Sequence, residues 1–327
     1  MQLPQGLVDR FRADLEPLWP FLDQPESRLG LAVSGGGDSL ALLLLAHAVL
    51  ASRIEAATVD HRLRPESAAE AEHVAALCRE LGVPHRIIPV TVEGGNLQDR
   101  ARAARYVALG EWCEERGLDG LATAHQMDDQ VETFIMRANR GSGVSGLSSI
   151  RALGTVPGAP LRLIRPLLGW RREELRDIVE AAGWEAMDDP SNENEAFDRI
   201  RIRKALSETD WIDFYGVAKS ARLLGEAEDT IDWMVGREYS ECVDAGAEET
   251  VYRTLQTGIG GTLIAGGVIR SIFRGFGVQI DMGAAAKLVE ALRAGRKSNV
   301  AGIEAVVRDQ DGERLWVFRR EVPRRTG

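Results

Sequence analysis

The chain has 327 residues, of which 44% are hydrophobic, and its formal net charge is −10. This length fits about two domains with a sizeable core, and the longest mainly apolar run, Leu40 to Ala51, is shorter than the roughly 20 residues that a membrane span needs. Charges near the N-terminus stand where a signal peptide would have its apolar region. We therefore expect a cytoplasmic protein that does not use a membrane.

The net charge and the spacing of the cysteines limit which partners and which kinds of site the protein can have. An acidic chain repels nucleic acid on average, so a nucleic-acid partner must meet local basic surface. Cys78, Cys113 and Cys242 lie far apart in the sequence. This spacing argues against a disulfide scaffold and against a zinc, redox or iron–sulfur site built from neighbouring cysteines.

Strand-like and helix-like segments alternate through the first part of the chain. The expected strands are Arg28–Val33, Ile54–Asp60, Val83–Val90, Leu118–Thr123 and Leu161–Ile164, and the expected helices are Ser39–Leu50, Ser67–Leu81, Leu97–Arg116, Asp128–Arg140 and Arg171–Ala182. This alternation predicts an α/β fold with a doubly wound parallel sheet, covered by helices on both faces. Ligands bind such sheets at the carboxyl ends of the strands.

The texture of the sequence changes from about Trp211. Helical patterns are followed, within Gly302–Arg320, by two strand-like runs around "DQDG", which is a hairpin signal. We therefore predict a boundary near Tyr215, with a first domain at residues 1–215 and a smaller, mainly helical C-terminal domain at 216–327. The helix expected over Arg222–Cys242 repeats apolar residues at the spacing of a buried face, namely Leu223, Ala227, Ile231 and Met234.

A glycine-rich turn joins the first expected strand to the first expected helix. It consists of Ser34, Gly35, Gly36, Gly37, Asp38 and Ser39. Backbone N–H groups and the positive end of the helix dipole converge there, and the glycines let the backbone approach an anion closely. The serine hydroxyls can donate to phosphate oxygens, and Asp38 is a natural ligand for an accompanying Mg²⁺. A glycine-rich turn without a ligand is the alternative, but two serines and an aspartate at this place favour phosphate binding.

The turn resembles the S-G-G-x-D-S signature of the PP-loop ATP pyrophosphatases, which have an adenine nucleotide alpha hydrolase-like fold and cleave ATP between its α- and β-phosphates. Seven further segments follow in order: VDHRLRPES, NLQDRARAARYVAL, TAHQMDDQVET, RGSGVSGLSSI, RPLL, DDPSN and RIRIR. Together they resemble the bacterial tRNA(Ile)-lysidine synthetase family, from Leu29 to about Leu206. The resemblance implies a ligase that forms a carbon–nitrogen bond in tRNA modification.

That family joins free L-lysine to C2 of the wobble cytidine of the isoleucine tRNA with a CAU anticodon, through an adenylated cytidine, and releases AMP and pyrophosphate. The resemblance thus implies ATP and Mg²⁺ as cofactors, an ATP-binding catalytic domain at 1–215 and a tRNA-contacting domain at 216–327. A homodimer stays an open alternative, because dimers occur in related enzymes. The resemblance assigns nucleotide contacts to the residues of the turn, to Val59 and Asp60 and to Arg105, with Asp38 on the metal.

Carboxylates are expected to handle the lysine. Its ammonium, with a pKa of about 10.4, must be recognised and then deprotonated before it can attack. Asp129 and Glu132 are spaced i, i+3 on one helical face, and the resemblance makes Asp129 the general base, with Asp128 and Glu132 in lysine or metal binding. The alternative is that acidic residues at a helix start only complement the helix dipole.

Histidine and arginine complete the expected site. His125 follows an expected strand end and is placed to contact the α-phosphate, whereas Gln126 stands where many members of the family have a second histidine, so we give it no catalytic role. Two groups of arginines are expected to meet the RNA or the nucleotide: Arg100, Arg102 and Arg105 on one helix, and Arg199, Arg201 and Arg203, which alternate with isoleucines and so present guanidinium groups on one side. A solvated charged face is the ordinary alternative. We assign Arg105 and Arg203 to the site, with Asp38, His125, Asp129 and Arg203 as its catalytic residues.

Two other functions are weighed against this one. A PP-loop tRNA thiolase shares the adenylation step, but such enzymes typically need paired cysteines near the site, and the cysteines here have no close partner in the sequence. A nucleotide-binding module without catalysis would not need Asp38, His125 and Asp129 together.

Overall fold

The computed structural model describes residues 3–62, 67–91, 97–187, 198–254 and 261–321. The chain divides into two compact units, Met1–Gly225 and Glu226–Gly327. The division lies within helix α9 (Phe214–Cys242), ten residues after Tyr215, the boundary suggested by the sequence.

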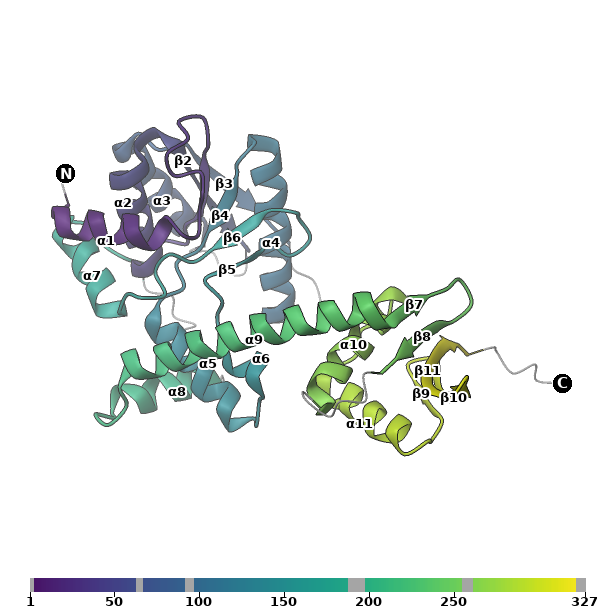
Figure 1. Ribbon diagram of the computed structural model, residues 1–327. Coiled ribbons are helices and arrows are strands. Elements are labelled where there is room, and N and C mark those ends of the chain that lie inside the picture. Colours follow the sequence, from purple (N-terminus) through teal and green to yellow (C-terminus); the bar gives the residue numbers. More distant parts are fainter. Residues whose placement is uncertain (1–2, 63–66, 92–96, 188–197, 255–260, 322–327) are drawn as a thin grey trace. The chain divides into compact units, whose positions relative to one another are not determined.

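A six-stranded sheet forms the centre of the first unit (Figure 1). Its order is β3-β2-β1-β4-β6-β5, and every neighbouring pair except β5 and β6 is parallel. The strands are β1 (Leu29–Ala32), β2 (Ile54–Asp60), β3 (His85–Pro89), β4 (Gly120–Ala122), β5 (Leu153–Thr155) and β6 (Arg162–Ile164). The predicted parallel sheet is thereby confirmed, with an antiparallel strand added at one edge.

Helices cover both faces of this sheet. The helices of this unit that precede α9 are α1 (Gln5–Leu15), α2 (Gly37–Leu50), α3 (Ser67–Leu81), α4 (Leu97–Arg116), α5 (Met127–Asn139), α6 (Val144–Leu147), α7 (Arg172–Ala181) and α8 (Asp198–Ser207), with a short 3₁₀ turn at Ala51–Arg53. Of these, α1, α2, α3 and α7 contribute to the core on one face of the sheet and α4 to the core on the other. Successive residues of β1 point to opposite faces: Leu29 and Leu31 join the core beneath α1, α2 and α7, whereas Ala32 joins the core beneath α4. This alternation fixes which helix faces which side of the sheet.

Two features of the sequence explain why β1 and α2 are so well buried. A Cβ on Gly30 would lie 2.9 Å from the Trp112 ring, so only glycine lets α4 approach the strand this closely. Helix α2 is apolar around most of its circumference because α1 and α7 both pack against it.

Among the described residues, no helix is long and apolar enough to cross a membrane.

The second unit combines helices with a five-stranded antiparallel sheet of order β7-β8-β11-β10-β9. Its elements are β7 (Val243–Ala245), β8 (Thr250–Arg253), α10 (Gly261–Gly275), α11 (Met282–Arg293), β9 (Ser298–Val300), β10 (Ile303–Gln310) and β11 (Glu313–Arg320). The predicted hairpin is confirmed: Gln310 pairs with Glu313, and Asp311 and Gly312 between them both have positive φ, as a two-residue hairpin turn requires. The three short strands β7, β8 and β9 were not expected.

The predicted buried face of α9 is wrong in part. Leu223, Ala227 and Met234 are exposed, and Ile231 alone of the four packs against the core of the second unit. A helical repeat of apolar residues shows which residues share a face, but the tertiary contacts decide whether that face is covered.

Candidate active site

The turn between β1 and α2 is closed by the Ser39 hydroxyl. Its Oγ accepts from the backbone N–H groups of Ser34 and Gly35, both at 3.1 Å, and donates to the Gly36 carbonyl at 2.8 Å. Ser39 is buried, while Ser34 is exposed. The hydroxyl of Ser39, expected to donate to phosphate, is therefore used within the turn, where it fixes the loop shape.

The backbone of the turn is shaped for an anion. Gly35 has a φ of +94°, and a Cβ there would also lie 3.3 Å from Val74. Gly36 is the N-cap of α2, so the amides of Gly37 and Asp38 head the helix, where backbone N–H groups have no intrahelical acceptor. Free amides and the helix dipole together make this turn the natural seat for a phosphate group.

Asp38 faces the carboxylates of α5. Burial and the nearby Asp129 raise its pKa from 3.8 to about 6, against the opposing effects of Arg172 and of a hydrogen bond from Gln126. Two buried carboxylates that repel each other are stabilised by a hard cation between them, and Mg²⁺ binds proteins through one or two carboxylates together with substrate phosphates. The oxygen ligands present therefore fit Mg²⁺, although no group of three or more metal-ligating side chains occurs in the described part of the chain.

His125 lies just after β4, where its surroundings disfavour the charged imidazolium. Its Nδ1 is 3.0 Å from Thr123 Oγ1. Burial, followed by the positive charges of Arg165 and Arg102, lowers its pKa well below 6.5. Because Nδ1 is engaged with Thr123, Nε2 is the ring nitrogen left for another partner, and the phosphate contact of His125 stays a prediction.

Arginines gather around His125 from three separate elements. Arg102 and Arg105 of α4, Arg165 after β6 and Arg199 of α8 all act on the pKa of His125, and burial lowers the pKa of Arg105 itself. In the described structure, Arg165 Nε and His61 Nδ1 are buried without a hydrogen-bond partner. Buried nitrogens without a partner, surrounded by positive charges, favour binding of a negatively charged ligand with hydrogen-bond acceptors. A nucleotide is such a ligand.

Asp60 fastens the turn that follows β2. Its carboxylate accepts from the Arg62 N–H at 2.9 Å and from the Ser67 hydroxyl at 2.7 Å, and its backbone carbonyl accepts from Val90 at 2.9 Å. Burial would raise the pKa of Asp60, but the hydrogen bonds from Ser67 and Arg62 outweigh it and lower the pKa. The nucleotide contacts of Val59 and Asp60 stay a prediction.

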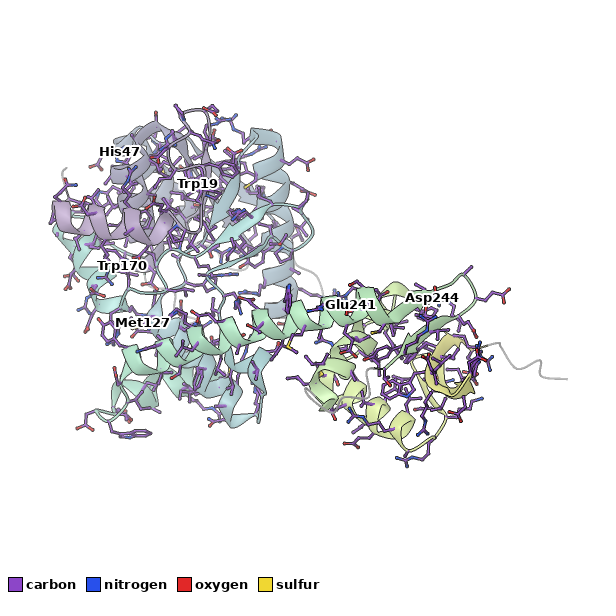
Figure 2. The ribbon with its side chains drawn as sticks, viewed as in Figure 1. Trp19, His47, Met127, Trp170, Glu241 and Asp244 are labelled. Atoms are coloured by element: carbon purple, nitrogen blue, oxygen red, sulfur yellow. The ribbon has the colours of Figure 1, made fainter. Side chains whose placement is uncertain are left out.

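The three carboxylates at the start of α5 have different surroundings. Asp128 accepts from Arg171 Nε at 3.1 Å, from Arg171 Nη2 at 3.2 Å and from the Arg172 backbone N–H at 2.9 Å. It thereby holds the beginning of α7 against α5. The adjoining Trp170 carbonyl accepts from Met127 N at 2.9 Å, and both of these residues are labelled in Figure 2.

Asp129 and Glu132 share a set of arginines. Arg199 donates to Asp129 at 2.9 Å and to Glu132 at 2.8 Å, while Arg203 and Arg172 donate to Glu132 at 2.8 and 3.0 Å. Burial would raise the pKa of Glu132, but these ion pairs, led by Arg203, outweigh it and lower the pKa. At Asp129 burial prevails over the nearby Arg199 and raises the pKa. Asp129 is thus the better proton acceptor of the two.

The arginines of α8 correct one interpretation of the sequence. Alternation of arginine and isoleucine suggested guanidinium groups on one side, but Asp198–Ser207 is a helix. Arg199 and Arg203, spaced i, i+4, therefore share the face that meets Glu132, whereas Arg201 is exposed. Arg203, which the sequence assigned to the site, contacts Glu132, and so does Arg199, which it did not assign to the site.

Arg172 and Gln126, to which the sequence assigned no role in the site, both contact its carboxylates. Arg172 reaches both Asp129 and Glu132, and no local pattern connects it to α5. Gln126 is the N-cap of α5, where Gln126 and Asp129 form a capping box; a polar residue three positions before an acidic one is a signal that could have found it. The segment DDPSN, at 188–192, lies outside the described residues.

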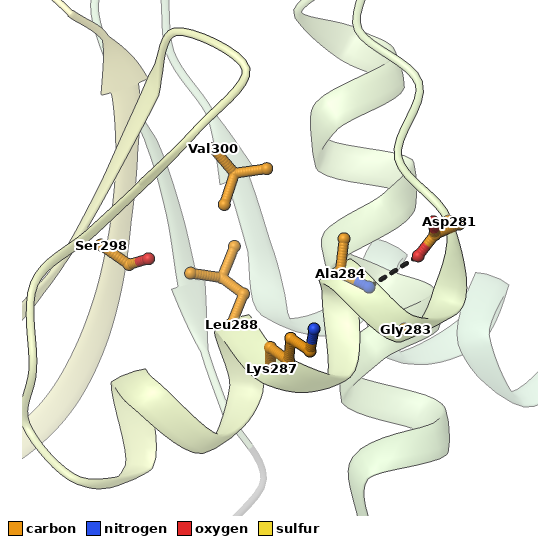
Figure 3. Close-up of a pocket in the computed structure, with 7 residues that line it drawn as sticks. All are labelled: Asp281, Gly283, Ala284, Lys287, Leu288, Ser298 and Val300. Carbon is orange, nitrogen blue, oxygen red and sulfur yellow. Dashed lines mark hydrogen bonds between the residues drawn. The ribbon is translucent and has the colours of Figure 1, made fainter.

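A hollow of about 500 Å³ occurs elsewhere, in the second unit, and Figure 3 shows its lining. Asp281, Lys287 and Ser298 are its polar side chains, and the Asp281 carboxylate accepts from the Ala284 N–H at the start of α11. Asp281 thus serves as a helix cap, and the candidate chemistry lies in the first unit instead.

The fold and the site together define a PP-loop protein, and comparison with known proteins agrees. A family model described as a PP-loop domain matches residues 9–209. Among solved structures, a tRNA thiolase from Methanococcus maripaludis is similar with a TM-score of 0.56 and 17% identity, over 68% of this chain and 78% of that one. This similarity shows a shared fold.

Curated relatives identify the family within this class. A tRNA(Ile)-lysidine synthase from Zymomonas mobilis is 38% identical over 99% of this chain and 98% of its own length. One from Novosphingobium aromaticivorans is 48% identical over 71% of this chain and 70% of its own length. The chain belongs to the tRNA(Ile)-lysidine synthase family.

Proposed function

We propose that the protein ligates L-lysine to C2 of the wobble cytidine of an isoleucine tRNA with a CAU anticodon, consuming ATP to AMP and pyrophosphate. One observation carries the proposal within this family. Asp38 of the glycine-rich turn interacts with Asp129 and with Gln126, and His125, the residue before Gln126, is surrounded by arginines. The histidine and the arginines suit a nucleotide, and the carboxylates suit a metal ion and an amine.

The first step would transfer AMP to the cytidine oxygen. The amides that head α2 hold the phosphates, and Arg105 and Arg165 supply positive charge around His125. His125, neutral and fixed at Nδ1 by Thr123, contacts the α-phosphate through Nε2. Asp38 would hold Mg²⁺, which neutralises the charge of the departing pyrophosphate when bound.

The second step would use Asp129 on the lysine amine. A carboxylate with a raised pKa is a better base than an ordinary one, and burial raises the pKa of Asp129. Glu132, whose pKa is lowered, stays ionised and adds negative charge beside the ammonium. Asp128 is the remaining residue that we assign to lysine binding, through its place at the head of the same helix.

The RNA would be met by exposed arginines of the first unit, such as Arg102 and Arg201, and by the second unit. Arginine on an acidic protein provides the local positive surface that a phosphate backbone needs. ATP and tRNA are both cytoplasmic molecules, so we place the reaction in the cytoplasm. We leave open a homodimer as the working form.

A thiolase is the rival function, and the cysteines count against it. Cys78 and Cys113 are buried, and burial raises the pKa of each to about 12. Cys242 is also buried, with a raised pKa. A sulfur carrier needs an accessible thiolate, and none of these three thiols provides one.

The proposal is tested by incubating the protein with ATP, Mg²⁺, labelled lysine and a CAU-anticodon isoleucine tRNA transcript. We expect label in the RNA together with AMP and pyrophosphate. Asp38→Ala should abolish pyrophosphate release, whereas Asp129→Ala should reduce lysine transfer more than adenylation. Formation of ADP and orthophosphate would overturn the proposal, and equal loss of both steps in Asp129→Ala would remove the general base.

A further inference from the structure

Gln126 lies between the phosphate turn and the carboxylates of α5. It is fully buried, with 0% of its surface exposed. Its side-chain oxygen accepts from the backbone N–H groups of Asp128 and Asp129, and its side-chain nitrogen donates to Asp38 at 3.5 Å. Its own backbone N–H donates to the Asp129 carboxylate at 3.3 Å. One residue therefore supplies a donor to each of the two facing carboxylates.

The orientation of this amide is dictated by its neighbours. The start of α5 presents N–H donors, so the amide must turn its oxygen towards them, because an NH₂ group there would oppose donors with donors. The NH₂ group is then necessarily directed the other way, towards Asp38 on α2. By capping α5, Gln126 thus directs its side-chain NH₂ group towards Asp38 on α2.

We infer that Gln126 is a positioning residue that holds Asp38 of the phosphate turn in register with Asp129 at the head of α5. The inference rests on the proposed function, because it gives the residue a task in the adenylation step. The distance of 3.5 Å is long for a hydrogen bond, and such contacts commonly tighten when substrate binds. A cap alone would not require glutamine, since shorter Asn, Asp or Ser side chains cap helices as well or better.

A shortened amide separates the two tasks of this side chain. Gln126→Asn keeps a side-chain oxygen that can cap α5, but its shorter side chain moves the NH₂ group away from Asp38 by the length of one methylene. We expect kcat for pyrophosphate release to fall about 10–100-fold, with KM for tRNA unchanged and the melting temperature within about 2 °C of the parent. Gln126→Ala loses both tasks and should show the same fall in kcat together with a lower melting temperature.

Gln130 offers a matched control on the same helix. It is also buried, and its side-chain oxygen accepts from Ile150 N at 2.8 Å. Gln130→Asn therefore shortens a buried amide one turn away without touching Asp38, and kcat should stay within about twofold of the parent. Equal kcat losses in Gln126→Asn and Gln130→Asn would overturn the inference, as would a parental kcat in Gln126→Asn.

A second measurement does not depend on turnover. ATP affinity is measured by calorimetry for Gln126→Asn, Asp38→Asn and the double variant. If Gln126 acts through Asp38, the double variant should bind ATP no more weakly than Asp38→Asn alone. If the fold-losses of ATP affinity in the two single variants multiply in the double variant, the inference would be overturned. Failure of the parent enzyme to transfer lysine would instead refute the proposed function, and the binding cycle would still report on the link.

Discussion

Glu132 is predicted to be the structural centre of the acidic half of the site. Its side chain is only 1% exposed, and it is paired with Arg172, Arg199 and Arg203, whose side chains are 33–38% exposed. Glu132→Gln removes the charge while keeping the shape. Removing one partner of a buried ion pair typically costs about 3–5 kcal/mol. The three arginines are partly hydrated, and Arg172 and Arg199 would still be paired with Asp129. We therefore expect Glu132→Gln to lower the free energy of unfolding by about 2–3 kcal/mol.

Urea unfolding of the two proteins at neutral pH measures this loss. The midpoint should fall while the slope stays constant, and the melting temperature should drop by about 4–12 °C for a unit of this size. Glu173→Gln is the matched control, since Glu173 is 65% exposed and lies 3.9 Å from Arg171; it should cost less than about 0.5 kcal/mol. A loss of less than 0.5 kcal/mol in Glu132→Gln would refute the central structural role.

The same ion pairs predict a pH dependence. The pKa of Glu132 is lowered from 4.5 in the folded protein, so the unfolded chain takes up the proton first as the pH falls. The stability that Glu132 contributes is therefore fully present above pH 4.5 and is lost as the pH falls through the lower, folded pKa. Glu132→Gln should lack this part of the acid sensitivity.

Three further predictions concern other parts of the first unit. Gly35→Ala forces a side chain onto a φ of +94°; we expect a loss of about 1 kcal/mol or more in unfolding experiments and weaker ATP binding by calorimetry. Burial lowers the pKa of His85 from 6.5 to about 4. The stability that its neutral form contributes is therefore present above pH 6.5 and is lost as the pH falls towards 4. In His85→Gln, the urea unfolding midpoint should change less between pH 6.5 and pH 4 than in the parent. Cys78 and Cys113, each with a pKa raised to about 12, should react with a thiol reagent about 10²–10³-fold more slowly in the native protein than in urea, and rapid reaction in the native protein would contradict their burial.

The sequence was informative where the signal is local. The glycines of the phosphate turn, the buried run of α2 and the alternation of strands with helices are all set by neighbouring residues, and the structure agrees with them. The carboxyl ends of β1 and β4 then bring Asp38 towards α5, because parallel neighbouring strands end at one edge. The glycine-rich turn and the ordered motifs of the family resemblance thus pointed to this edge of the sheet from the sequence alone.

The partners of the acidic residues were not predictable in the same way. Arg172 is 40 positions from Glu132, and the two meet because hydrogen bonds of Asp128 and of the Trp170 carbonyl join the start of α7 to the start of α5. The arginines of α8 were misread because alternation over five residues has the period of a strand, whereas α8 packs on α5 as a helix. Ser39 illustrates a third limit, since a hydroxyl in a tight turn can serve either a ligand or its own backbone.

Burial gives the two chemical groups of the site a common property. It lowers the pKa of His125 and raises that of Asp129, so in each case it disfavours the charged form. A phosphate group beside His125 would raise the pKa of the imidazole, and a lysine ammonium beside Asp129 would lower the pKa of the carboxyl. Each substrate would therefore stabilise the charged form of the side chain that it meets. The nucleotide half and the amine half of the site thus respond to different ligands.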